Sequence, residues 1–248
     1  MEKIALVTGS SRGIGRAVAT ELARQGWAVC INYREREDCA RSLVEQLTGE
    51  GCRVMAVQAD VACREQVNAM ARQVEDAFGP VALLVNNAGV AGQALFQDIT
   101  DELWHRYFSV NVDGAYHAIQ AVLPAMLHRH EGCIINTSSI CGLIGHMNTP
   151  EAYTATKGAI TLLTKSVAAR YGKDNIRCNS IHPATVDTPF VAALMADPVK
   201  KQARLNEIPL GRLTSVEDVA NAVLYLASDE ASFLNGVNLP IDGGVTCY

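Results

Sequence analysis

Short apolar runs alternate with longer amphipathic stretches along the whole chain, and this alternation most restricts the possible folds. A strand followed by a helix, repeated many times, is typical of a parallel sheet, because parallel strands need a crossover connection. Several runs are apolar throughout, as expected for strands that are buried on both faces. We therefore expect an α/β fold in which residues 1–248 form a single doubly wound domain with helices on both faces of a parallel sheet.

The pattern predicts the approximate limits of each element. The expected strands cover residues 4–7, 29–33, 53–58, 82–85, 133–138, 177–181 and 237–240, and the expected helices cover 14–25, 40–49, 65–78, 101–129 (with a break near 113–114), 153–171 and 217–228. Ser215 is the expected N-cap of the last helix. The segment 185–212 departs from the alternation and carries three prolines. Because ligands bind beyond the carboxyl ends of such strands, we predict that this insertion is a substrate lid, with a short helix near 189–196.

Composition excludes several classes of protein. A net charge of −5 offers no strongly basic face for nucleic acid, and no apolar run reaches the ~20 residues needed to span a bilayer. The chain enters its first strand directly after Met1-Glu2-Lys3, so we expect a cytoplasmic protein without a signal peptide. The eight cysteines form no C-x-x-C pair, which favours reduced thiols over disulfides. We expect no metal site, because His128 and His130 fit a solvated helix end better than zinc ligands.

A glycine-rich loop follows the first expected strand and precedes the first helix. Its spacing is G-x-x-x-G-x-G, and the residues expected to bind a cofactor diphosphate are Gly9, Ser11, Arg12, Gly13, Ile14 and Gly15. Glycines allow a close backbone approach, and the helix N-terminus adds free N–H groups. A structural turn is the alternative, but the position in the first βα unit favours a Rossmann-type cofactor site.

The end of the second expected strand bears on the choice of cofactor. Proteins that bind NAD place an acidic residue there for the ribose 2′-hydroxyl, whereas this chain has Asn32, Tyr33 and Arg34. Arg12 and Arg34 together favour a 2′-phosphate, so we expect NADP(H) rather than NAD(H). Glu35 and Asp38 could instead pair with Arg34.

The candidate catalytic residues follow the fifth strand. Tyr153 and Lys157 lie four residues apart and share a helix face, so the ammonium should lower the phenol pKa and make proton transfer feasible. Ser139 follows the fifth strand, where a hydroxyl can polarise a carbonyl. Asn111 lies in a helical stretch, where a buried amide needs partners; it could kink the helix or hold a water. Each of these motifs alone is weak evidence.

Together these segments resemble the short-chain dehydrogenase/reductase family along nearly the whole chain. The match covers residues 8–15, Asp60, Val61, Asn86, Asn87, Ala88, Gly89, Asn111, Ser139, Tyr153, Lys157, Pro183 and Asp242-Gly243-Gly244. The resemblance implies that Tyr153 is the general acid–base, that Lys157 lowers its pKa and binds the nicotinamide ribose, and that Ser139 orients the substrate oxygen. It also implies that Asn111 holds a water of a proton relay.

The resemblance further implies cofactor contacts. Asp60 and Val61 would flank the adenine, Asn87 with Ala88 and Gly89 would contact the ribose region, and Pro183, Val186 and Thr188 would border the carboxamide. Two features depart from the family pattern. Pro183 is followed by Ala184 instead of glycine, and the segment from Ser139 to Tyr153 is about one residue longer, with His146, Met147 and Asn148 either lining the substrate pocket or filling a loop.

The chain is most similar to the branch that contains 3-oxoacyl-acyl-carrier-protein reductases and sugar or polyol dehydrogenases. We expect reduction of a 3-oxoacyl thioester, with a sugar or polyol as the alternative substrate. Small basic clusters at 128–130 and 170–173 are candidate docks for an acidic carrier protein. A non-catalytic NADP(H)-binding regulatory protein and a cofactor-dependent isomerase or epimerase are further alternatives. The resemblance also implies a homotetramer, or a dimer, formed through the long helices and the last strand.

Overall fold

The computed structural model describes residues 3–92, 94–147, 149–188, 191 and 196–247. Its centre is a seven-stranded sheet in the order β3-β2-β1-β4-β5-β6-β7, with every neighbouring pair parallel. The strands are β1 (Ile4–Val7), β2 (Ala28–Tyr33), β3 (Val54–Gln58), β4 (Leu83–Asn86), β5 (Gly132–Thr137), β6 (Ile176–Pro183) and β7 (Asn238–Ile241). The strand order reverses between β1 and β4, and a crevice at such a point binds ligands in doubly wound folds.

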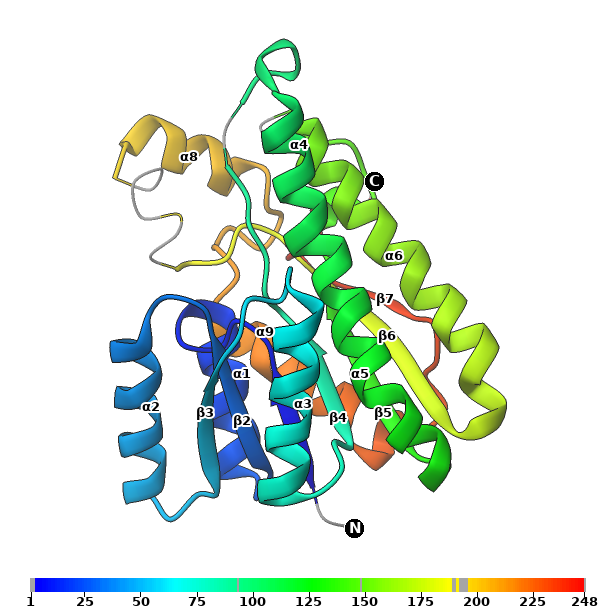
Figure 1. The fold of residues 1–248 in the computed structure, drawn as a ribbon. Coiled ribbons are helices and arrows are strands. Elements are labelled where there is room, and N and C mark those ends of the chain that lie inside the picture. The colour runs from blue at the N-terminus through cyan, green and yellow to red at the C-terminus, as the bar shows by residue number, and fades with distance from the viewer. Residues whose placement is uncertain (1–2, 93, 148, 189–190, 192–195, 248) are drawn as a thin grey trace.

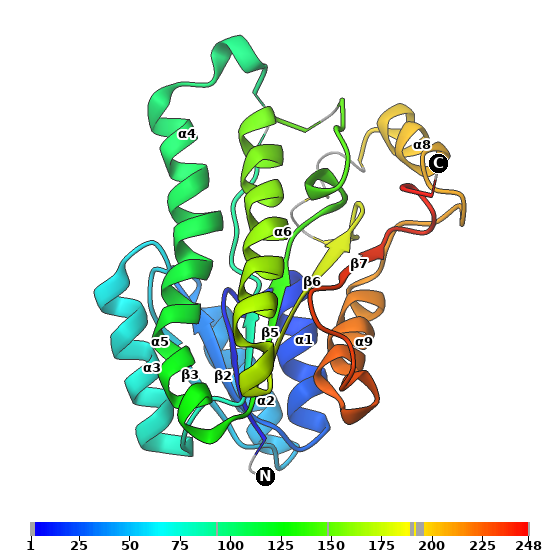
Figure 2. The same ribbon diagram turned by 90° about the vertical axis from the view of Figure 1, so that its right-hand side faces the viewer.

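Helices cover both faces of the sheet (Figure 1). One layer contains α1 (Gly13–Arg24), α2 (Glu37–Gly49) and α9 (Val216–Ala227), and the other contains α3 (Arg64–Phe78), α5 (Gly114–Arg129) and α6 (Glu151–Tyr171). Figure 2 shows α3 and α5 on one side of the sheet and α1 and α9 on the other. The predicted doubly wound, Rossmann-type architecture is thereby confirmed.

Consecutive residues of the strands enter different cores, which explains the uninterrupted apolar runs. Leu6 packs with the α3 and α5 side chains, whereas its neighbour Val7 packs with those of α1 and α9. Both side chains are fully buried. A strand covered on both faces has no polar side to reveal its period of two.

Two details of the helices agree with the sequence-based expectations. Ser215 caps α9, and the reciprocal bond from its backbone N–H to Asp218 completes a capping box. The long stretch 101–129 is divided into α4 (Asp101–Phe108) and α5 by a π-helical turn, Ser109–Asp113, close to the expected break. Within the described part of the chain, no helix is long and apolar enough to cross a membrane.

The described part of the segment 185–212 lies above the carboxyl edge of the sheet, as the position of α8 shows (Figure 1). Its described helix is α8 (Pro198–Asn206), which begins at the N-cap Asp197. Most of the short helix expected near 189–196 falls outside the described residues. The base of the segment rests on the C-terminal turn, because Leu210 N donates to Gly243 O over 3.1 Å.

Candidate active site

The glycine loop between β1 and α1 is pressed against the segment that follows β4. Gly9 has a φ of +63°, and a Cβ at this position would lie 2.8 Å from Cα of Ala88. A Cβ on Gly15 would lie 2.5 Å from Nδ2 of Asn87. Only glycine fits at these two positions, so the loop spacing follows from packing at the crevice between β1 and β4.

Buried polar groups hold this loop in place. Thr8 Oγ1 accepts hydrogen bonds from the backbone N–H groups of Asn87 (3.0 Å) and Ala88 (3.1 Å). Asn87 Nδ2 donates in return to Thr8 O (2.9 Å) and Gly9 O (3.1 Å). Gly9 N donates to Oδ1 of the buried Asn32 over 3.0 Å. The side chains of Asn32 and Asn87, which were predicted to contact the cofactor, therefore hold the glycine loop in its conformation. The Thr8 hydroxyl has the same effect, and the sequence analysis assigned it no individual role.

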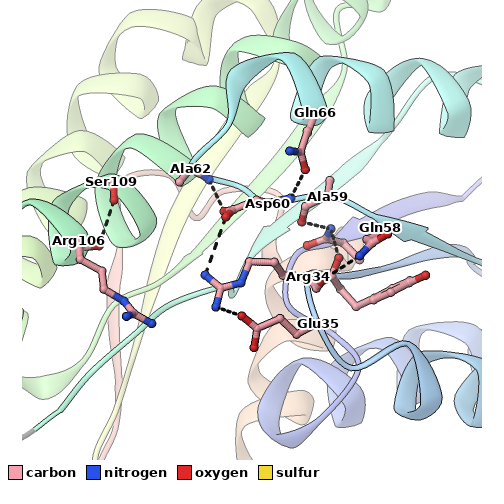
Figure 3. Close-up of polar contacts among 11 residues, drawn as sticks. Arg34, Glu35, Gln58, Ala59, Asp60, Ala62, Gln66, Arg106 and Ser109 are labelled. Atoms are coloured by element: carbon pink, nitrogen blue, oxygen red, sulfur yellow. Dashed lines mark hydrogen bonds and ion pairs between the residues drawn. The ribbon is translucent and has the colours of Figure 1, made fainter.

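Arg34 lies at the carboxyl end of β2 between two carboxylates (Figure 3). Its guanidinium is paired with Glu35 and lies 3.8 Å from Asp60 Oδ2. Asp38, the other expected competitor, instead pairs with Arg36 over 2.7 Å. The side chain of Arg34 is 41% exposed, so the guanidinium remains accessible to a ligand.

Asp60 is fixed at the end of β3 by its own neighbours. Its carboxylate accepts a hydrogen bond from Ala62 N (2.9 Å), and its backbone N–H donates to Gln66 Oε1 (2.8 Å). The next residue, Val61, is buried and packs against Gly114 at the start of α5. The carboxylate of Asp60 and the apolar side chain of Val61 therefore lie next to each other at the edge of the crevice.

Tyr153, Lys157 and Ser139 come together at the carboxyl edge of β5. Lys157 Nζ lies 5.5 Å from the centre of the Tyr153 ring and donates to Thr137 O over 2.8 Å. Ser139 precedes the short helix Ile140–Gly142, and its Oγ accepts from Cys141 N over 3.2 Å. The same hydroxyl lowers the pKa of the Tyr153 phenol, against the larger effect of burial. The structure thus places all three predicted side chains in one site.

Burial controls the ionisation of this site. It raises the pKa of Tyr153, and the hydrogen bond with Ser139 opposes this effect only in part. Burial also lowers the pKa of Lys157 to about 8. The Lys157 ammonium is directed at Thr137 O, and its effect on the pKa of Tyr153 stays a prediction. At neutral pH Tyr153 is therefore protonated, which is the form of a proton donor.

Asn111 lies in the π-helical turn between α4 and α5, and its amide is fully used. Oδ1 accepts from Val90 N (2.7 Å), while Nδ2 donates to Val90 O (2.9 Å) and Thr156 Oγ1 (3.0 Å). The side chain consequently links the segment after β4 to α6, which carries Tyr153 and Lys157. The wide turn allows the amide to reach both neighbours.

A small cavity of about 10 Å³ lies beside Asn111 and the ends of β4 and β5. Two buried atoms that border it, Asn86 Oδ1 and Thr137 Oγ1, have no hydrogen-bond partner within the described part of the chain. The volume matches that of one water molecule, and a buried water needs polar partners of this kind. The lining therefore suits one bound water.

The segment after β6 brings the remaining predicted residues to the glycine loop. Pro183 ends β6, and Val186 forms an isolated parallel bridge with Thr214. A Cβ on Gly13 would lie 3.8 Å from Cγ2 of Thr188, so Thr188 stands over the loop.

The longer segment after Ser139 contacts α8 and its C-cap. His146 Nε2 lies 3.3 Å from Glu207 Oε2 and 3.1 Å from Arg204 Nη1, and Arg204 pairs with Glu207 over 2.9 Å. His146 therefore joins the segment after Ser139 to α8, whereas Met147 is fully exposed and Asn148 lies outside the described residues.

Two side chains near Tyr153 were not predicted from the sequence. Tyr107 of α4 is buried, and its phenol lies against Gly92 and raises the pKa of Tyr153. His182 of β6 is fully buried and contacts the backbone of Ser139. Both occupy positions at which an apolar residue would satisfy the same helix or strand pattern, so periodicity alone gave no signal.

The comparisons with known proteins agree with this site. A family model described as enoyl-(acyl carrier protein) reductase matches residues 9–246. The chain belongs to the short-chain dehydrogenase/reductase family. It is accordingly an oxidoreductase of the kind that acts on CH–OH groups.

Three relatives show the range of this part of the family. The 3-oxoacyl-[acyl-carrier-protein] reductase FabG of Staphylococcus aureus (strain Mu50 / ATCC 700699) is 38% identical over 245 residues, covering 99% of this chain and 98% of the relative. The L-rhamnose 1-dehydrogenase (NAD(P)(+)) of Sphingomonas sp. (strain SKA58) is 38% identical over 244 residues, covering 98% and 96%. A crystal structure of a gluconate 5-dehydrogenase from Burkholderia cenocepacia J2315, in complex with NADP and tartrate, superimposes with a TM-score of 0.94 at 35% identity, covering 99% and 96%.

Proposed function

We propose that this protein interconverts a ketone and a secondary alcohol with NADP(H), and that its substrate is a 3-oxoacyl thioester. The observation that carries this proposal is the convergence of Tyr153, Ser139 and Lys157 at the carboxyl edge of β5, next to the segment after β4 that packs against the glycine loop. A protonated phenol held by a serine hydroxyl at a sheet edge suits proton donation to a carbonyl oxygen.

The proposed mechanism assigns one task to each side chain. Bound NADPH supplies the hydride for reduction of the carbonyl carbon. Tyr153 gives its proton to the developing alkoxide, and in oxidation the phenolate takes that proton back. Ser139 donates a hydrogen bond that orients the carbonyl oxygen and stabilises its charge. The Lys157 ammonium stabilises the phenolate and holds the ribose hydroxyls.

Asn111 and the adjacent cavity would return a proton to the site. The π-helical turn places Asn111 beside a space for one water, which Asn86 Oδ1 and Thr137 Oγ1 can also bind. Thr137 O already accepts from Lys157, so a water there would lie next to the ammonium. We infer that this water is part of the path from Lys157 to solvent.

The glycine loop suits a dinucleotide, because Gly9 and Gly15 let it pack closely against the segment after β4 at the crevice between β1 and β4. Ser11, Arg12, Gly13 and Ile14 surround the N-terminus of α1, where free N–H groups suit a diphosphate. In this proposal Asp60 and Val61 flank the adenine, and Asn87, Ala88 and Gly89 border the ribose. Pro183, Val186 and Thr188 face the carboxamide, and the segment 185–212 closes over the substrate.

The choice of NADP(H) over NAD(H) rests on Arg34 and Arg12. The guanidinium of Arg34 stands at the end of β2, where a 2′-phosphate would lie, and it can exchange Glu35 for that phosphate. The solved gluconate 5-dehydrogenase is described as a complex with NADP, which supports the same preference.

A sugar or polyol is the second candidate substrate, because relatives named FabG and L-rhamnose 1-dehydrogenase are equally identical to this chain. The decisive experiment measures turnover of acetoacetyl thioester, simple diketones and a sugar panel, with NADPH compared with NADH. Oxidation of NADPH by the thioester would support our first choice. Turnover of a sugar with NAD(P)+ alone would instead support a sugar or polyol as the substrate.

We also propose a cytoplasmic homotetramer. Cys30 and Cys178 are buried as apolar side chains in the core, which suits a reducing compartment. Tyr116 on α5 and Leu162 on α6 expose apolar surface on the long helices, and Phe233 does so before β7. Light scattering after size exclusion distinguishes a tetramer from a dimer, and loss of assembly in Leu162→Glu would support the helix interface.

A further inference from the structure

His182 is a fully buried histidine that the proposed mechanism does not use. It lies near the carboxyl end of β6, one residue before Pro183. Its Nδ1 is 2.8 Å from the backbone oxygen of Ser139, and its Nε2 is 2.8 Å from Ser180 Oγ. Both ring nitrogens thus have a partner inside the protein, and one partner is the peptide of the proposed substrate-orienting serine.

The chemistry of these contacts fixes the tautomer. A carbonyl oxygen can only accept, so Nδ1 must carry a proton and donate to Ser139 O. Burial lowers the pKa of His182, which favours the neutral ring and leaves Nε2 as an acceptor. Ser180 Oγ must then donate to Nε2.

Asn238 of β7 completes this arrangement. Its Oδ1 lies 2.9 Å from Ser180 Oγ, but the single hydroxyl proton of Ser180 is already used by His182. A half-turn of the Asn238 amide presents Nδ2 and supplies the donor that Ser180 then requires. The result is a directional chain from Asn238 through Ser180 and His182 to the Ser139 carbonyl.

The segment carrying Ser139 is attached to β6 at two points. Ser138 N donates to Ile181 O over 2.9 Å, as an extension of the sheet pairing. The second attachment is the His182 bond, which lies beyond the last paired residues of β5 and β6, Thr137 and Ile181. The Ser139 carbonyl also accepts from Gly142 N within its own turn (2.8 Å), so the His182 bond is the one that ties this carbonyl to β6 and sets its direction relative to the sheet.

We propose that His182 is a positioning residue, which holds the Ser139 hydroxyl in its productive direction by donating a hydrogen bond from Nδ1 to the Ser139 carbonyl. This inference rests on the role proposed above for Ser139. It assigns to His182 no contact with substrate or cofactor.

Two substitutions separate the two ring contacts. In His182→Asn the side-chain amide nitrogen occupies the place of Nδ1 and keeps the bond to Ser139 O. In His182→Gln the longer amide reaches toward Ser180 instead and loses that bond. Both substitutions change the buried volume, so the melting temperatures of the two variants serve as the control for a general loss of stability.

The expected difference is kinetic. His182→Gln should lower kcat about 10- to 100-fold, the cost of a misdirected reacting group, while the Kd for NADPH stays within about threefold. His182→Asn should recover most of that loss. Equal kcat values in two variants of equal stability would overturn the proposal.

A double-variant cycle tests whether His182 acts through Ser139. In a Ser139→Ala background, His182→Gln should change kcat by less than about threefold, because the hydroxyl to be positioned is gone. The full loss in that background would show that His182 acts by another route. If Ser139→Ala itself leaves kcat unchanged, the proposed function fails at Ser139.

A measurement on the resting enzyme does not depend on the substrate. The ¹⁵N chemical shifts of histidine-labelled protein, assigned with His182→Gln, distinguish the two neutral tautomers. The Nδ1–H tautomer at His182 is expected at pH 7. The Nε2–H tautomer would exclude donation to Ser139 O and overturn the inference, whatever substrate the enzyme uses.

Discussion

The guanidinium of Arg34 lies 3.8 Å from the carboxylate of Asp60, so the residue expected to bind a 2′-phosphate faces one expected beside the adenine. Glu35 pairs with the same guanidinium. A bound phosphate must therefore compete with two carboxylates, and its net attraction is smaller than that of a free arginine. Single substitutions of Arg34 or of the carboxylates beside it should therefore change how strongly the protein prefers NADPH to NADH.

Substitution of Arg34 should weaken NADPH selectively. In Arg34→Ala, the loss of a charge-assisted hydrogen bond should reduce kcat/KM for NADPH about 10- to 100-fold and leave that for NADH nearly unchanged. Arg36→Ala is the matched control, because Arg36 is also exposed and pairs with Asp38. Equal losses with both cofactors would contradict the assigned role of Arg34.

Glu35→Gln should have the opposite effect. Removal of this carboxylate frees the Arg34 guanidinium for phosphate, so the Kd for NADPH should fall several-fold, and the gain should shrink at high salt. Fluorescence titration at two ionic strengths checks both points. A weaker affinity would mean that Glu35 orients Arg34 for binding and does not compete.

Tyr153→Phe should abolish turnover and preserve cofactor binding. Removal of a general acid costs about 10²- to 10⁴-fold in kcat, whereas the ring and its packing remain. The measurements are NADPH oxidation and the Kd for NADPH. Wild-type protein that binds NADPH but turns over none of the panel would instead favour the regulatory alternative.

Lys157 predicts how cofactor affinity depends on pH. An amine is charged below its pKa, and burial lowers the pKa of Lys157 to about 8, so its positive charge is present at pH 7 and is lost as the pH rises through 8. The affinity for NADPH should then fall up to about tenfold per pH unit above 8. Lys157→Arg keeps its charge and should show no such decline, so a decline shared by both proteins would exclude Lys157 as its cause.

The lowered pKa of Lys157 also determines how the free energy of unfolding changes with pH. The folded-state pKa of about 8 lies below the ordinary lysine value of 10.5, so the unfolded chain binds the proton more tightly between these values. The free energy of unfolding of the wild type, relative to that of Lys157→Met, should therefore rise with pH from about 8 to 10.5. Urea unfolding at a series of pH values measures this difference.

Thr8 offers a test of the loop structure. Thr8→Val keeps the shape but removes the acceptor for the N–H groups of Asn87 and Ala88, which should lower the free energy of unfolding by about 1–3 kcal/mol. The Kd for NADPH should rise as the loop loosens. Thr8→Ser keeps the hydroxyl and should differ little from wild type, so a large loss in both variants would indicate that the methyl group matters instead.

The sequence predicted the elements well because their signals are local. Apolar runs mark β1 and β5, and Ser215 followed by Asp218 marks the start of α9 in the chain itself. The proximity of Tyr153 and Lys157 was predictable for a related reason: both lie on one helix, so their distance is fixed by sequence spacing. The resemblance to a family supplied the roles that spacing could not.

The remaining features depend on contacts between distant segments. His182 and Ser139 are 43 positions apart, and only the pairing of β5 with β6 brings them together. The burial of the Tyr153 phenol, which raises its pKa, is likewise invisible in the sequence, whereas the proximity of Lys157 is visible there. Burial depends on the whole fold, so sequence spacing alone could not predict it.

The C-terminal turn has a practical consequence for experiments on this chain. Asp242 accepts from the backbone N–H groups of Gly244 and Thr246 (both 2.9 Å), and Gly243 O accepts from Leu210 at the base of 185–212. A label attached to the exposed Cys247 would thus lie beside the segment proposed to admit substrate. The helix α2 lies far from this turn (Figure 1), so surface tethers and fluorescent labels belong on its exposed positions.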